Sequence, residues 1–71
     1  MNQKNDDYIR FAVADQPLPP EWELMVNELK KNNIDYHIKE YTQRNGIIEV
    51  SLFMSEKNAD QLVGFLEKYD L

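Results

Sequence analysis

The chain has 71 residues, 42% hydrophobic and 30% charged, which is typical of one small globular domain rather than a disordered segment. It contains no cysteine, which excludes disulfide bonds and thiolate chemistry. Thirteen acidic and eight basic residues give a net charge of −5. An acidic surface repels nucleic-acid phosphates and anionic membranes, so we expect neither as a partner.

The N-terminal segment is polar. We expect residues 1–7 to form a disordered tail without a secretory signal, followed by a single α+β domain over residues 8–71. No segment approaches the ~18 apolar residues of a membrane span, and the sequence therefore predicts a cytoplasmic protein.

The first predicted element is a half-buried strand over residues 8–14, where side chains alternate in character. The residues expected on the buried side are Ile9, Phe11 and Val13. Those expected to point outward are Tyr8, Arg10, Ala12 and Ala14. Three prolines between residues 17 and 20 end the strand, because proline cannot donate a backbone hydrogen bond.

A helix is predicted after the prolines. Its apolar residues recur at helical spacing and are Trp22, Met25, Val26 and Leu29. Asn32 and Asn33 suit the left-handed cap at its end.

Two strands joined by a glycine turn follow. Residues 34–38 alternate, and the chain then turns at Gly46 into a strand over residues 47–54. A two-residue turn would divide the apolar side chains between two faces. A three-residue turn with Gly46 in the left-handed conformation unites them and places Ile38 opposite Leu52, so we predict this turn.

The last predicted element is a helix capped by Ser55. Its apolar residues are Ala59, Leu62, Val63 and Leu66. The element order is β-α-β-β-α, and two helices with one apolar face each should cover one face of a three-stranded sheet. A right-handed crossover gives the strand order 1-3-2, which resembles a truncated ferredoxin-like fold without its final strand.

The sequence contains no catalytic motif. The single histidine, His37, is expected on an outward sheet face without metal-ligand spacing or a neighbouring nucleophile. There is no glycine-rich phosphate loop. We therefore predict a protein that is not an enzyme and uses no cofactor and no metal.

The outward face of the sheet is the main candidate site. Solvated sheet faces are usually polar, whereas this one carries aromatic and apolar residues, which favours a surface that a protein partner covers. The candidate partner-binding residues are Tyr8, Arg10, His37, Tyr41, Ile47 and Phe53. The free edge of the first strand is a second candidate, for pairing with a partner or with a second copy in a homodimer.

A family resemblance is carried by Asn33-Ile34-Asp35-Tyr36 and by residues 46–66. This pattern resembles short ACT-like domains of prokaryotic signal-transducing proteins, although the proline-rich entry at residues 18–20 departs from it. The resemblance implies a small regulatory or adaptor role and transfers no catalytic or ligand-binding residue.

Three functional hypotheses follow. The first is a non-catalytic protein-binding module with a regulatory or adaptor role. The alternative is an acidic inhibitor, of the kind that phages or mobile elements encode, which occupies the nucleic-acid-binding groove of a target protein through Glu21, Glu23 and Glu28. The third is an ACT-type small-ligand sensor, which needs a pocket.

Overall fold

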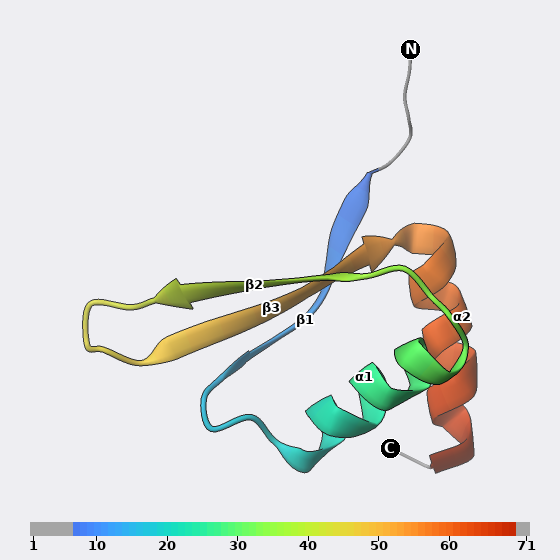
Figure 1. Ribbon diagram of the computed structural model, residues 1–71, viewed down its shortest axis with the longest axis horizontal. Helices are drawn as coiled ribbons and strands as arrows, with labels where there is room; N and C mark the ends of the chain where they lie inside the picture. Colours follow the sequence, from blue (N-terminus) through green and yellow to red (C-terminus); the bar gives the residue numbers. More distant parts are fainter. Residues whose placement is uncertain (1–6, 70–71) are drawn as a thin grey trace.

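The computed structural model of the chain describes residues 7–69, which form one sheet packed against helices (Figure 1). The elements are β1 (Tyr8–Asp15), α1 (Pro20–Lys31), β2 (His37–Thr42), β3 (Ile48–Ser55), α2 (Glu56–Leu66) and the 3₁₀ turn η1 (Glu67–Tyr69). The predicted tail falls almost wholly on residues 1–6, which lie outside the described residues, as do residues 70 and 71.

The sheet is antiparallel, with β3 between β1 and β2. Both helices lie on the same side of it (Figure 1). The predicted α+β class, the β-α-β-β-α element order and the strand order 1-3-2 are therefore confirmed. The core lies between β3 and the two helices and consists of Trp22, Leu29, Ile34, Val50, Leu52, Met54, Ala59 and Leu62.

The turn between β2 and β3 has the predicted three-residue geometry. Gly46 has a φ of 87°, in the left-handed region that favours glycine. Its N–H donates to the carbonyl of Gln43 at 2.9 Å, and the N–H of Gln43 donates to the carbonyl of Ile47 at 2.8 Å. The resulting register places Ile38 opposite Leu52, as predicted.

Strand β1 departs from the predicted alternation. The register against β3 shifts between Arg10 and Ala12, which makes Phe11 the extra residue of a β-bulge. Side chains after a bulge change face, so Ala12 and Ala14 pack toward the core while Val13 is 47% exposed. The predicted faces of these three residues were wrong, because strict alternation allows for no inserted residue.

The helix ends follow local sequence signals. Asn33 adopts a φ of 56° after α1, and the N–H of Ile34 donates to the carbonyl of Leu29 at 2.9 Å, as in a Schellman motif. This turn delivers Ile34 to the core. At the start of α2, the hydroxyl of Ser55 accepts a hydrogen bond from the backbone N–H of Asn58 at 3.2 Å, which confirms the predicted cap.

Candidate functional site

The sheet face turned away from the helices, called the outer face below, is built from rows of residues that lie side by side on the three strands. Its residues are Tyr8, Arg10, Val13, Asp15, His37, Lys39, Tyr41, Glu49, Ser51, Phe53 and Ser55. The central row joins Arg10, Phe53 and His37, because Arg10 and His37 both lie opposite Phe53. The predicted pairing of Phe53 with His37 is thus confirmed.

A cation lies close to the ring of Phe53. The Nζ atom of Lys39 lies 5.6 Å from the centre of this ring, within the range of a cation–π interaction. Arg10 lies beside Phe53 on the other neighbouring strand. Within residues 7–69, neither cation forms an ion pair with a carboxylate. A half-buried aromatic ring, with Lys39 over it and Arg10 on the neighbouring strand, therefore lies in the middle of the outer face of an acidic protein.

Tyr8 links the two edge strands across β3. It lies opposite Ser55, whose small side chain leaves room for the tyrosine to reach β2. The rings of Tyr8 and His37 meet edge to face, with centroids 4.6 Å apart and planes at 73°. The hydroxyl of Tyr8 also donates to the carboxylate of Asp35. His37 is thereby held in a ring contact on the outer face.

The remaining predicted residues lie nearer the hairpin end. Tyr41 is 64% exposed and pairs with Glu49, while Ile47 lies in the turn before β3. In the same region, the side-chain amide of Gln43 donates to Asp15 at 2.9 Å. The structure therefore brings the predicted site residues of the central row and Tyr8 together and leaves Tyr41 and Ile47 apart from them.

Lys39 and Val13 also lie on the outer face but were absent from the predicted site. Alternation along β2 places Lys39 beside His37 and Tyr41, and this signal was available in the sequence. Val13 could not be found in the same way, because its outward position depends on the bulge at Phe11.

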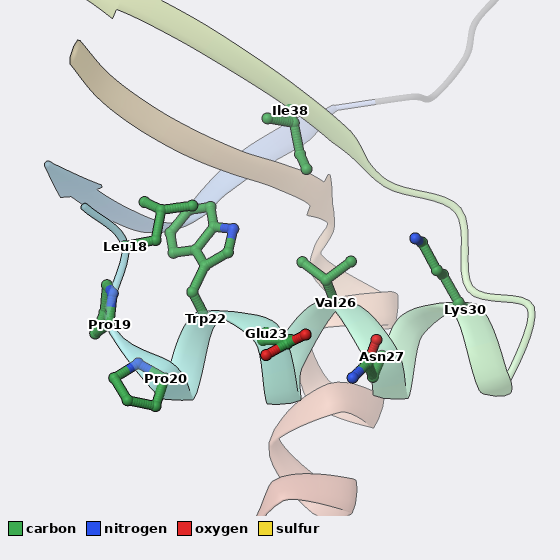
Figure 2. A pocket seen from close by; sticks show the side chains of 9 residues that line it. All are labelled: Leu18, Pro19, Pro20, Trp22, Glu23, Val26, Asn27, Lys30 and Ile38. Atoms are coloured by element: carbon green, nitrogen blue, oxygen red, sulfur yellow. The ribbon is translucent and has the colours of Figure 1, made fainter. Parts of the chain in front are cut away.

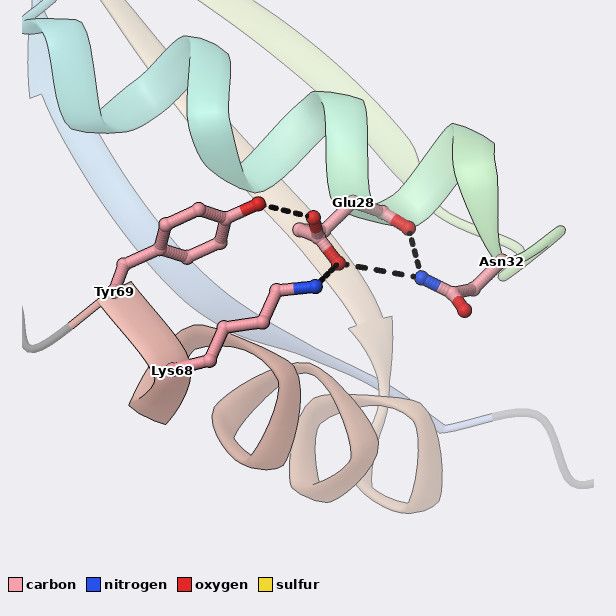
Figure 3. Close-up of polar contacts among 4 residues, drawn as sticks. All are labelled: Glu28, Asn32, Lys68 and Tyr69. Atoms are coloured by element: carbon pink, nitrogen blue, oxygen red, sulfur yellow. Dashed lines mark hydrogen bonds and ion pairs between the residues drawn. The ribbon is translucent and has the colours of Figure 1, made fainter.

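The predicted acidic surface on α1 is wrong at one of its three residues. Glu21 and Glu23 are exposed, but Glu28 is buried. The hydroxyl of Tyr69 donates to Oε2 of Glu28 at 2.5 Å, and Nζ of Lys68 lies 3.4 Å from Oε1 (Figure 3). Glu28 therefore links η1 to α1 rather than facing solvent.

These contacts alter the ionisation of both partners. The hydrogen bond from Tyr69 is the main reason why the pKa of the Glu28 carboxyl is lowered, and Lys68 adds to the effect, against the opposing effect of burial. The same hydrogen bond raises the pKa of the Tyr69 hydroxyl. The ionised carboxylate of Glu28 is thus the form that the fold prefers.

A groove lies on the other side of the molecule, between α1 and β2. Its apolar lining consists of Leu18, Pro19, Pro20, Trp22, Val26 and Ile38, with Glu23, Asn27 and Lys30 as polar neighbours (Figure 2). Its volume of about 620 Å³ is within the range of ligand-binding clefts. Sequence patterning did not reveal this groove, because alternation predicted that Ile38 would be buried, whereas this side chain is 43% exposed.

No protein-family model matches the chain, and neither a curated protein nor a solved structure is significantly similar to it. The resemblance to ACT-like domains therefore stays a prediction. Within residues 7–69, no three acidic or histidine side chains are grouped so that they could hold a metal ion. In the same part of the chain, neither helix has the length and hydrophobicity that crossing a membrane requires.

Proposed function

We propose that this protein is a non-catalytic binding module that recognises a protein partner through its outer face and thereby acts as a regulator or adaptor. The observation that supports the proposal is the central row of the outer face. There, Phe53 lies between Arg10 and His37, with Lys39 above its ring. Aromatic and arginine side chains are the residues most enriched at the energetic centres of protein interfaces.

The charges of the outer face indicate what such a partner offers. Arg10 and Lys39 have no carboxylate partner within the described residues, although the chain has a net charge of −5. Acidic groups of a partner would pair with these two cations beside Phe53, while an apolar side chain packs on its ring. Reversing one of these charges would place like charges together, which costs several kcal/mol.

The alternative of an acidic inhibitor receives less support. Two of its three carboxylates, Glu21 and Glu23, are exposed near the start of α1, where the helix dipole favours negative charge. Glu28 is bound by Tyr69 and Lys68 and is not available to a target protein. Helix α1 therefore presents a smaller acidic surface than the inhibitor hypothesis requires.

Quantitative affinity capture tests the proposal. The bait is the full chain, compared with the outer-face variants Phe53→Ser and Arg10→Glu and with the control Val63→Ser. Val63 is 48% exposed on α2, so its substitution changes surface on another element while leaving the outer face intact. We expect proteins enriched by the parent chain and by the control to be depleted at least about tenfold with both outer-face variants, the effect of losing about 1.4 kcal/mol.

Circular dichroism first establishes that each variant is folded, which matters most for the half-buried Phe53. Arg10→Glu does not depend on this check to the same degree, because Arg10 is exposed. Equal capture of the same proteins by all four baits would refute binding through the outer face.

A further inference from the structure

Strand β2 forms one edge of the sheet. All six of its residues are exposed, and it contains neither a bulge nor a proline. The other edge strand, β1, is interrupted by its bulge at Phe11, a feature that hinders pairing with further strands. Of the two free edges, β2 is therefore the one suited to accept another strand.

The hairpin geometry identifies which backbone groups are free on this edge. The N–H of Gln43, just after β2, donates to the carbonyl of Ile47, just before β3. In an antiparallel ladder, every second residue of a strand bonds to the same neighbouring strand. The backbone N–H and C=O groups of Ile38, Glu40 and Thr42 therefore point away from β3, toward the open edge. These three residues lie on the helix side of the sheet, because Ile38 is opposite the buried Leu52.

The groove between α1 and β2 lies on this same side of the sheet. Ile38 on β2 lies across it from Val26 on α1, with Trp22 toward one end and Lys30 at the other (Figure 2). From Trp22 to Lys30 the helix rises about 12 Å, at roughly 1.5 Å per residue. An extended chain covers that distance in about four residues. The groove is thus long enough to lie alongside a short extended segment.

The two ends of the groove carry opposite charges. Lys30 lies in the last turn of α1, next to the segment that leads into β2, whereas Glu23 lies in the first turn. Glu40 lies on the helix side of β2, opposite Val50, and further along the strand from that segment. A complementary strand would therefore carry an acidic residue near Lys30 and a basic residue toward Glu23 and Glu40.

We propose that the free edge of β2 and this groove form a second binding site, which takes an extended segment of a protein partner by strand addition. The segment pairs through its backbone with Ile38, Glu40 and Thr42, and its alternate side chains, which are apolar, enter the groove over Trp22 and Val26. The site is separate from the outer face and does not depend on the function proposed for it.

A second copy of this chain fits the edge poorly. In a two-fold antiparallel pair of β2 strands, the residue at the centre lies opposite itself. A pair centred on the middle of β2 would place Lys39 opposite Lys39 or Glu40 opposite Glu40. Like charges directly opposite each other destabilise a sheet, so a different chain is the better occupant.

Trp22 provides a direct assay, because it is the only tryptophan in the chain and it lines the groove. The probes are two synthetic peptides, Lys-Thr-Val-Thr-Val-Thr-Glu, whose charges and valines lie on the same face of the strand, and the same sequence with its terminal charges exchanged. We expect at least one of them to change Trp22 emission saturably and to slow hydrogen exchange of the Ile38, Glu40 and Thr42 amides. Methylating the valine nitrogens of that peptide should weaken binding about tenfold or more, since each lost hydrogen bond costs about 1 kcal/mol.

Substitutions in the full chain locate the binding site of the peptide. Glu40→Pro removes one N–H from the open edge and no bond to β3, so it should weaken peptide binding about tenfold, whereas Glu40→Ala retains the N–H and should bind at least five times more tightly than the proline variant. The control Val63→Ser should bind like the parent chain.

Three results would overturn the strand-addition site. They are no response to either peptide, equal binding of the methylated peptide, and binding that survives Glu40→Pro but is lost in Phe53→Ser. The third result would place the peptide on the outer face, and it would thus support the proposed function while excluding this site.

Discussion

The position of Val13 provides the sharpest test of the bulge in β1. Val13 is 47% exposed on the outer face, whereas Val50 on β3 is 2% exposed in the core. The substitutions Val13→Ala and Val50→Ala remove the same atoms from two strands of one sheet. Their energetic difference therefore reports the difference in burial and largely cancels the difference in strand propensity between valine and alanine.

The expected magnitudes follow from burial. Valine is two carbon groups larger than alanine, and each fully buried group contributes about 0.8 kcal/mol. Val50→Ala loses this full amount of about 1.6 kcal/mol and leaves a cavity as well, so we expect it to cost roughly 2–3 kcal/mol. Val13→Ala loses only about half of the transfer term and leaves no enclosed cavity, which amounts to about 0.8 kcal/mol.

Equilibrium urea unfolding, followed by Trp22 fluorescence, measures both variants against the parent chain. The difference matters because a domain of this size has a stability of only about 3–5 kcal/mol. Val50→Ala should remove about half of it or more and Val13→Ala less than a third. If the two substitutions cost the same, strand β1 would follow unbroken alternation, Val13 would belong to the core, and the composition of the outer face given above would be wrong.

Two further predictions concern the glycines and Glu28. Gly46→Ala should destabilise the protein by about 1 kcal/mol or more, because Gly46 has a positive φ. Gly64→Ala should stabilise it by up to about 1 kcal/mol, since a Cβ at Gly64 meets no atom. Thermal unfolding measures the stability of both variants against the parent chain. The lowered pKa of Glu28 means that its stabilising contribution is full above the pKa of the unfolded state and is lost as pH falls through the folded pKa. In urea titrations over acidic pH, Glu28→Gln should lose less stability between neutral and acidic pH than Glu21→Gln; equal acid dependence would contradict the role of the Tyr69 contact.

The fold was largely predictable because strong local signals agreed with the global pattern. Gly46 allows only one turn that unites the apolar residues of both hairpin strands, and Asn33 and Ser55 mark helix ends through their own backbone bonding. The bulge at Phe11 was not predictable in this way. It adds a residue within an apolar run that fits unbroken alternation equally well, and as a result Ala12 packs toward the core.

The two features of α1 that the sequence did not reveal depend on distant partners. Glu28 has the spacing of a charged residue on a solvated helix, and its burial comes from Tyr69, which is 41 positions away. The groove depends in a similar way on how far α1 lies from β2. Alternation gives the direction in which Ile38 points, but it cannot say whether a helix covers that side chain.

Strand β2 connects the two proposed sites, because its odd and even residues contribute to different surfaces. Lys39 lies on the outer face, while the backbone edge and side chain of Glu40 belong to the groove side. The register that Gly46 sets therefore determines both surfaces at once, and a slip by one residue would exchange them. In the native register, neighbouring substitutions should act on different partners: Lys39→Glu should weaken only capture through the outer face, and Glu40→Pro only strand addition. Their independence follows from the two-residue period of a strand and from nothing else in the fold.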